Sequence, residues 1–280
     1  MGIAVRYRFP LRLALNVSWI AVALCGCSIN LGALTPTDRG EPAQPGSSSN
    51  IASLTEAIKR NPDDPRAYDR RGKALAQAGK TDEALADFNK AISLDPYDAQ
   101  SYADRGSLYR QIRRLDDAAA DDEHALALDA NNAAAHLGRG LAAKARNQPD
   151  AALADLSQAI VLSPDNAEAY YNRALLYQAE NQHQLAIDDF TAANGLTPQQ
   201  AGPLIGRAQS YLALDRPREA AADLDEAVQV DPQNPQGWLM RGLAYERLGD
   251  RTKAAGSYGR AINLRPRDET ARAGFARVGG

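Results

Sequence analysis

The sequence contains little of the chemistry on which enzymes, metal sites and disulfide frameworks depend. Its 280 residues include only two cysteines, Cys25 and Cys27, so no disulfide framework or cysteine-ligated metal site can form in the chain that follows them. The three histidines, His124, His136 and His183, show no metal-ligand spacing. No nucleophile, base and orienting residue can be grouped along the chain. We therefore expect a protein that is not an enzyme and that needs no cofactor and no metal.

Bulky apolar residues and an excess of basic charge are also missing. The chain has four Phe, two Met and two Trp, so much of its 44% hydrophobic content is alanine, which favours helix strongly. It carries 32 basic and 35 acidic residues, for a net charge of −3. A surface that binds nucleic acid would need clustered basic residues. We expect an all-helical protein without a nucleic-acid partner.

Only one hydrophobic run stands out, and it lies at the N-terminus. Arg6, Arg8 and Arg12 precede an apolar stretch from Leu13 to Leu24, which at about 12 residues is shorter than the roughly 20 that span a bilayer. A basic start, a short apolar stretch and small residues are typical of a secretory signal. A signal anchor is the alternative interpretation.

The end of this signal resembles the lipobox of bacterial lipoproteins. The motif is Leu24-Cys25-Gly26-Cys27, with an unusual cysteine at its second position. The resemblance implies that residues 1–26 are removed and that Cys27 is lipidated, which anchors the chain to a membrane. The rival interpretation is cleavage after Ala23, which would leave both cysteines as free thiols. Residues 27–50 are rich in Pro, Gly and Ser and are predicted to form a flexible tether.

The rest of the chain repeats every 34 residues, which indicates a repeat solenoid. With Pro65 as position 1, six units follow at 65–98, 99–132, 133–166, 167–200, 201–234 and 235–268. Alanine recurs at positions 20 and 27, starting with Ala84 and Ala91, and proline recurs at position 32. Apolar residues at helical spacing predict two helices in each unit, separated by a break such as Gly79-Lys80-Thr81.

These positions resemble the tetratricopeptide repeat (TPR) family. The match is a bulky residue at position 4, a small one at position 8, Ala at 20, an apolar residue at 24, Ala at 27 and Pro at 32. The resemblance implies a right-handed TPR superhelix, an α-solenoid of six full helix-turn-helix repeats. One departure is Asp122 at position 24, where the other units have an apolar residue, so we expect the second unit to be locally looser or its helix to be slightly shifted.

Partial repeats are predicted at both ends. Residues 51–64 fit the second half of a preceding unit, and residues 269–280, which contain Phe275, fit a short capping helix. A solenoid needs atypical ends to cover its terminal faces. The C-terminal cap is thin, so a homodimer through the end repeats is a further expectation.

A ladder of arginines at position 7 is accompanied by a ladder of aspartates at position 23. An anion-binding strip is one interpretation, and a repeated bidentate ion pair between the two helices of a unit is the one we favour. Arg241 has Ser257 in place of the aspartate, so we expect it to be free. The expected pairs are Arg71 with Asp87, Arg105 with Asp121, Arg139 with Asp155, Arg173 with Asp189, and Arg207 with Asp223.

In the TPR family the first helix of each unit lines a concave groove through positions 2, 5, 9 and 12. Units 1 and 2 carry polar residues there, and units 3 to 6 carry apolar ones, which suits an extended or helical partner segment. The alternative is that some of these side chains pack against the next unit. The predicted groove residues are Leu137, Leu141, Tyr171, Leu175, Ile205, Leu212, Leu239 and Leu243.

A lipobox followed by TPR units is similar to bacterial TPR lipoproteins of the NlpI type. This resemblance implies a membrane-anchored periplasmic adaptor of a Gram-negative bacterium, which binds envelope proteins or peptides and recruits a hydrolase or a protease. Ser28 after the acceptor cysteine favours the outer membrane. Assembly of a pilus or a secretion system is one alternative, and regulation of an envelope enzyme is another.

Overall fold

The computed structural model describes residue 44 and residues 46–279, and over these residues it contains 14 α-helices and no strand. The predicted all-helical solenoid is confirmed. The helices are α1 (Ser48–Arg60), α2 (Pro65–Gln77), α3 (Thr81–Leu94), α4 (Ala99–Gln111), α5 (Leu115–Leu128), α6 (Ala133–Ala145), α7 (Pro149–Leu162), α8 (Ala167–Ala179), α9 (His183–Leu196), α10 (Ala201–Ala213), α11 (Pro217–Val230), α12 (Pro235–Arg247), α13 (Arg251–Leu264) and α14 (Glu269–Arg277).

Each 34-residue unit holds one pair of helices, and the last residue of each unit starts the next pair. The N-cap residue of α2 is Asp64, whose side chain accepts a hydrogen bond from the backbone N–H of Arg66. Asp or Asn caps α4, α6, α8, α12 and α14 in the same way, whereas Gln200 before α10 makes no such bond. Because a short polar side chain satisfies a free N–H group at the helix start, it fixes where each first helix begins.

A left-handed residue ends every first helix. Position 15 has a positive φ in all six units, and the following N–H bonds back to the carbonyl five residues earlier, as Lys80 does to Leu75. Glycine adopts this conformation freely, but the non-glycine residues at this position each carry a cost of about 1 kcal/mol. They are Arg113 (φ 65°), Asn147 (φ 56°), Asn181 (φ 59°) and Asp215 (φ 55°).

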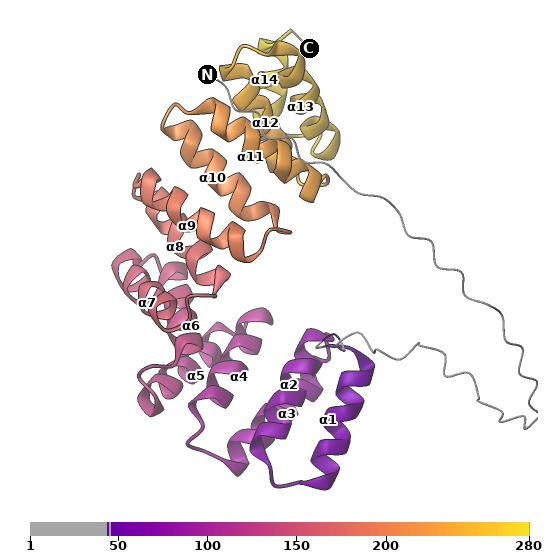
Figure 1. Ribbon diagram of the computed structural model, residues 1–280, viewed down its shortest axis with the longest axis vertical. Coiled ribbons are helices and arrows are strands. Elements are labelled where there is room, and N and C mark those ends of the chain that lie inside the picture. The colour runs from indigo at the N-terminus through magenta and orange to yellow at the C-terminus, as the bar shows by residue number, and fades with distance from the viewer. Residues whose placement is uncertain (1–43, 45, 280) are drawn as a thin grey trace, which may run out of the picture. The chain divides into compact units, whose positions relative to one another are not determined.

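The helix pairs stack one on another from α2 to α13 (Figure 1). First helices (α2, α4, α6, α8, α10 and α12) contact the first helix of the next unit, whereas over the described residues no second helix (α3, α5, α7, α9, α11 or α13) contacts another second helix. Neighbouring units therefore lie closer together at their first helices than at their second helices. The side of the first helices is for this reason the inner face of the solenoid. Alanines at positions 20 and 27, such as Ala84 and Ala91 with 0% exposure, let the helices approach closely within each unit.

Both ends of the solenoid carry helices. α1 begins at Ser48, so the last three residues of the predicted tether are helical, because the Ser47 hydroxyl accepts a hydrogen bond from the backbone N–H of Asn50 at 3.3 Å. α14 lies where the capping helix was predicted, and Phe275 packs against the core of the last repeats. The predicted signal peptide, Cys27 and most of the tether lie outside the described residues. None of the helices described is long and apolar enough to cross a membrane.

Candidate functional site

The arginine at position 7 and the aspartate at position 23 form an ion pair in each of the first five units. In the first unit Arg71 Nε lies 2.7 Å from Asp87 Oδ2, and Arg71 Nη2 lies 2.7 Å from Asp87 Oδ1. The same two-bond geometry, at 2.7–2.8 Å, joins Arg105 to Asp121, Arg139 to Asp155, Arg173 to Asp189, and Arg207 to Asp223. These side chains are committed to the scaffold, so they form no anion-binding strip.

Four of these five arginines also connect neighbouring units, which was not predicted from the sequence. Arg173 Nη1 donates to Ser157 Oγ at 3.1 Å, and Arg207 Nη1 donates to Thr191 Oγ1 at 3.0 Å. Thr55 and Asn89 receive the corresponding bonds from Arg71 and Arg105. Each acceptor is a small polar residue at position 25 of the preceding unit. That recurrence is the sequence signal that could have revealed the contact.

The expectation that Arg241 is free is wrong. Its Nε lies 2.6 Å from Asp225 Oδ1, and its Nη1 donates to Ser257 Oγ at 2.8 Å. Asp225 stands at position 25 of the preceding unit. The carboxylate that pairs with Arg241 therefore comes from the second helix of the preceding unit, and not from the second helix of its own unit. The Tyr245 hydroxyl donates to the other oxygen of Asp225 at 2.7 Å. The last unit therefore keeps the arginine contact with a different partner.

Half of the predicted groove residues do not line a groove. They are buried between helices, with 4–8% of their surface exposed, because they pack against the next unit, which was the alternative interpretation of the pattern: Leu137, Ile205, Leu212 and Leu239. The other four are half-buried, with one side against the core and the other open: Leu141, Tyr171, Leu175 and Leu243. Only this second set, which we call the groove set, can contact a partner without a rearrangement.

One member of the groove set lines a pocket of about 610 Å³ between the starts of α8 and α10. Tyr171 and Asn172 lie on one side, Pro203 lies on the other, and Thr197 and Gln200 complete the wall from the connection between α9 and α10. The pocket offers an aromatic ring together with several amide and hydroxyl groups. Such a lining can hold a side chain and the backbone of a bound segment.

The polar residues of units 1 and 2 are largely engaged in contacts between helices. Lys73 Nζ lies 2.9 Å from Asp69 Oδ2 and 2.7 Å from Asp104 Oδ2, so it connects α2 to α4. Burial and the neighbouring Asp104 carboxylate raise the pKa of Asp69 to about 6. In unit 3, Lys144 donates to Asn172 at 2.8 Å and so connects α6 to α8. The polar character of the inner face thus serves mainly to join successive first helices.

The second unit is not looser at Asp122. This side chain is 1% exposed, and its Oδ2 accepts a hydrogen bond from Arg110 Nη1 at 2.6 Å. An ion pair therefore fills the place of the apolar residue found in the other units. A Cβ atom on Gly138 would collide with both partners, so the glycine provides the space for them. Burial raises the pKa of Asp122 to about 6, against the opposite effect of Arg110.

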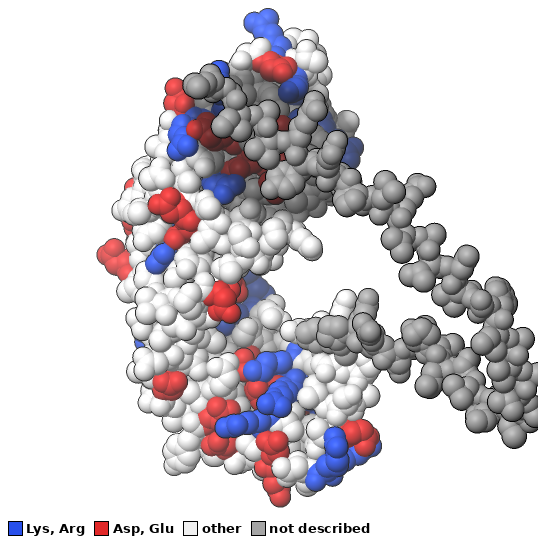
Figure 2. All heavy atoms as spheres, viewed as in Figure 1, with Lys and Arg blue, Asp and Glu red and all other residues white. Residues whose placement is uncertain are grey.

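The charge on the surface also differs between the first units and the middle units. In the space-filling view, blue and red side chains gather over the first repeats, and the region over the middle repeats is mostly white (Figure 2). Over the described part of the chain, no group of three or more His, Cys, Asp or Glu residues is placed to hold a metal ion. The site that the geometry offers is thus the groove set, a strip of half-buried apolar side chains on the first helices of units 3, 4 and 6.

Family models of one kind match the chain. Models described as tetratricopeptide repeat match residues 51–99 with 205–269, and residues 167–200, and a model described as TPR repeat matches residues 143–181. Together these segments make up more than half of the sequence. No curated protein matches it.

Three similar solved structures show the same fold. The APC/C hetero-tetramer Cut9-Hcn1 is 15% identical over 84% of this chain with a TM-score of 0.69, and 46% of that chain is covered. PilF of Pseudomonas aeruginosa is 21% identical, with a TM-score of 0.68, over 80% of this chain and 99% of its own. PilW, described as a widely conserved type IV pilus biogenesis factor, is 15% identical, with a TM-score of 0.62, over 75% of this chain and 97% of its own.

Proposed function

We propose that this chain, which belongs to the tetratricopeptide repeat family, is a scaffold that holds a segment of a partner protein along the inner face of its first helices. The groove set carries the proposal: Leu141, Tyr171, Leu175 and Leu243 are half-buried apolar side chains on first helices. A fully buried leucine contributes about 1.5–3 kcal/mol, so each half-buried one has roughly 1 kcal/mol left for a partner to gain. A bound extended or helical segment would cover them in succession.

The groove proposal predicts that charge on this strip abolishes partner binding. In the variant Leu141→Glu, Leu175→Glu, Leu243→Glu, a partner would have to bury carboxylates without counter-charges, so we expect its capture to fall at least tenfold. The measurement is an affinity pull-down from envelope extracts with quantitative mass spectrometry. Circular dichroism before the pull-down verifies the helix content.

The control places three substitutions by Glu on second helices, away from the inner face. Val161, Leu185 and Leu196, on α7 and α9, are exposed by 71%, 47% and 40%, and none belongs to the groove set. Their replacement by Glu changes the net charge equally, so we expect the captured proteins to be those of the unchanged chain. Equal capture by the groove variant and the control, with helix content intact, would refute the groove proposal.

We also propose that the scaffold is anchored to the outer membrane of a Gram-negative bacterium through Cys27, as in TPR lipoproteins of the NlpI type. The support is the sequence: three arginines, a short apolar run, the motif Leu24-Cys25-Gly26-Cys27, and Ser28 after it. More than one acyl chain is needed for stable anchoring, and lipoprotein maturation would supply them. On this basis the partners are envelope proteins, among them the hydrolases or proteases that an adaptor would recruit.

The anchor predicts different outcomes for the two cysteines. Cys27→Ala should move the protein from the membrane fraction to the soluble fraction, because the acyl chains have no acceptor. Cys25→Ala is the matched control and should leave the protein in the membrane fraction, because that residue is removed with the signal. Fractionation followed by immunoblotting measures both. A Cys27→Ala protein that stays with the membrane would contradict lipidation at this residue.

A second candidate function is assembly of a type IV pilus. The observation that favours it is the likeness to PilW, whose length this chain covers almost completely. At 15% identity that likeness concerns the fold, so the captured proteins decide between the two functions. Pilus components would favour assembly, and hydrolases or proteases would favour the adaptor.

A further inference from the structure

The pocket between the starts of α8 and α10 carries two carboxylates in its wall. They are Asp165, in the connection before α8, and Glu168, in the first turn of α8. Both residues are exposed, so a bound segment can reach them. The described residues that line the pocket include no Lys, Arg or His. With a volume of about 610 Å³, the pocket has room for a long side chain and part of a backbone.

Neither carboxylate has a counter-charge within the described chain. Asp165 Oδ1 accepts a hydrogen bond from Ser163 Oγ at 2.6 Å, which lowers the pKa of Asp165 and keeps it ionised at neutral pH. The Glu168 side chain makes no hydrogen bond or ion pair with a described residue. Lys144 on α6 approaches the pocket, but its Nζ donates to Asn172 at 2.8 Å and pairs with neither carboxylate. The wall therefore carries two uncompensated negative charges.

This pair of acids is a departure from the repeat. Position 33 of one unit and position 2 of the next flank each junction between units, and only the junction of units 3 and 4 is acidic at both positions. The other junctions within the six units carry Tyr97 and Gln100, Asn131 and Ala134, Gln199 and Gly202, and Gln233 and Gln236. Since those junctions form without carboxylates, the fold does not require Asp165 or Glu168.

Tyr171 adds an aromatic wall to the same pocket. Its ring packs against Phe190 at a centroid distance of 5.7 Å. The Arg173 guanidinium lies over the ring of the neighbouring Tyr170, at 5.8 Å from its centroid, whereas no cation of the described chain lies over Tyr171. Cations are attracted to the face of such a ring. The ring and the carboxylates therefore favour a guest of the same charge.

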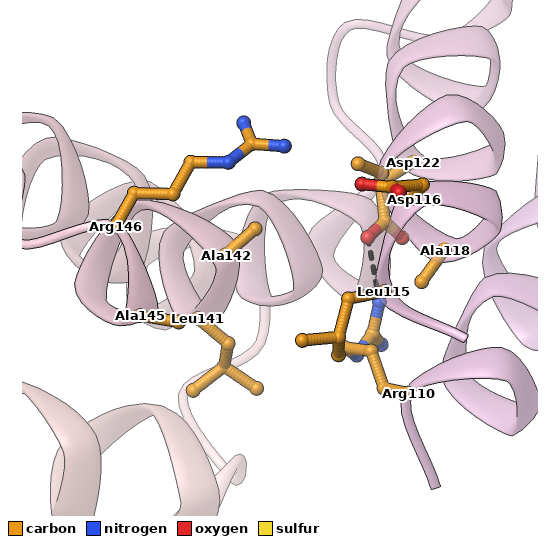
Figure 3. Close-up of a pocket in the computed structure, with 10 residues that line it drawn as sticks. Arg110, Leu115, Asp116, Ala118, Asp122, Leu141, Ala142, Ala145 and Arg146 are labelled. Carbon is orange, nitrogen blue, oxygen red and sulfur yellow. Dashed lines mark hydrogen bonds and ion pairs between the residues drawn. The ribbon is translucent and has the colours of Figure 1, made fainter. Parts of the chain in front are cut away.

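The pocket between α4, α5 and α6 has no such preference (Figure 3). Its volume is about 260 Å³, and its charged residues are two arginines and two aspartates. Arg110 already bonds to Asp122 at 2.6 Å, as the dashed line in Figure 3 marks. Because these charges balance, this pocket selects neither a cation nor an anion. The charge complementarity is confined to the pocket at α8 and α10.

The acidic wall continues into the groove set along α8. Glu168, Tyr171 and Leu175 are spaced by three and four residues, so they lie on one face of the helix. The helix rises about 10 Å from Glu168 to Leu175. Three residues of an extended segment cover about the same length. A segment that lies along α8 therefore meets the carboxylates, and about three residues later the apolar side chains.

We propose that this pocket receives a basic side chain of the partner segment, and that an apolar side chain of the same segment covers Leu175. The assignment rests on the proposed scaffold function, because Tyr171 and Leu175 belong to the groove set. It gives the partner a chemical class: a segment in which an arginine or a lysine lies about three residues from an apolar residue.

Three blocked heptapeptides test the charge. Each has leucine at both ends and glycine spacers, so that it fits in either direction, and its central residue is arginine, citrulline or glutamate. Citrulline has nearly the shape of arginine without its charge. We expect the arginine peptide to shift the methyl signals of Ala167 and Leu175 in the labelled full chain, with a dissociation constant of the order of 1 mM. The citrulline peptide should bind about tenfold more weakly, because it forgoes two exposed ion pairs, and the glutamate peptide more weakly still.

Two double variants show whether these carboxylates select the charge. Asp165→Asn with Glu168→Gln keeps the size of both side chains, so we expect it to bind the arginine and citrulline peptides equally. The matched control is Asp188→Asn with Glu226→Gln, which changes the net charge equally at exposed residues of the second helices α9 and α11. The control should keep the tenfold preference for arginine.

Three outcomes would overturn the assignment. They are equal binding of the arginine and citrulline peptides by the unchanged chain, an arginine preference that survives in Asp165→Asn with Glu168→Gln, and no methyl shift with the arginine peptide at about 10 mM, tenfold above the expected constant.

These results are separable from the test of the groove. Loss of partners in the groove variant, without an arginine preference in the unchanged chain, refutes the basic side chain alone. An arginine preference together with full partner capture by the groove variant refutes the proposed function alone.

Discussion

Asp189→Ala should lower the free energy of unfolding by about 3–5 kcal/mol, because it leaves a buried arginine without its counter-charge. Asp189 is 6% exposed, and it accepts hydrogen bonds from Arg173 Nε at 2.7 Å and from Arg173 Nη2 at 2.8 Å. The Arg173 side chain is only 18% exposed, so water can replace little of what is lost. Its one remaining bond, to Ser157, belongs to the preceding unit.

The control for this prediction is the arginine–aspartate pair of the last unit, Arg241 with Asp225. Asp225 pairs with Arg241 at 2.6 Å, but its side chain is 40% exposed, so solvent screens the interaction. We expect Asp225→Ala to cost about 1 kcal/mol or less, although it also removes the acceptor of the Tyr245 hydroxyl. Urea denaturation followed by circular dichroism gives both values. Equal losses of unfolding free energy in the two variants would show that burial does not determine how much each Arg–Asp pair stabilises the fold.

The repeat period made the fold predictable from the sequence. Helix pairs, their boundaries and the Arg–Asp pairing recur every 34 residues, so each unit supports the interpretation of the others. The pairing of Arg71 with Asp87 was predictable because both helices of one unit come from a continuous stretch of sequence. Consecutive helices usually lie side by side, so an Arg and an Asp that recur at fixed positions of every unit indicate a contact between the two helices.

Contacts between units were much less predictable. Leu137 and Leu141 lie four residues apart on the same helix and both fit the family's groove positions, yet the first is buried and the second is half-open. The difference depends on how closely the next unit approaches, which no residue within the unit specifies. Arg241 illustrates the same point, because its aspartate comes from the preceding repeat.

The prediction for Asp122 was wrong for a related reason. Asp122 interrupts an apolar position, and in a single sequence this looks like a local defect of the repeat. Its partner Arg110 lies on the preceding helix, at a position expected to face the groove. Only the structure shows that the two side chains meet in the space left by Gly138 of the next unit. Three helices from two units, α4 and α5 of the second and α6 of the third, must pack together before this ion pair is enclosed.

The Asp122 carboxyl should make stability fall as the pH rises from about 4 to about 6. Burial raises its pKa from 3.8 to about 6, so the folded chain keeps this proton where the unfolded chain has already released it. Between the two values the folded state binds more protons, and the stability contributed by this group declines with increasing pH. A difference of about two pKa units corresponds to about 3 kcal/mol.

The measurement is the difference in the free energy of unfolding between the unchanged chain and Asp122→Asn, from urea titrations at pH 4 and pH 7. Asn keeps an acceptor for Arg110 but does not titrate, so the other groups that change protonation cancel in the difference. We expect the unchanged chain to gain about 3 kcal/mol relative to the variant at the lower pH. Arg110 and Arg139 lower the pKa of this carboxyl, while burial and Asp121 raise it. A difference that stays constant between pH 4 and pH 7 would mean that the arginines offset the effect of burial, and it would contradict the raised pKa.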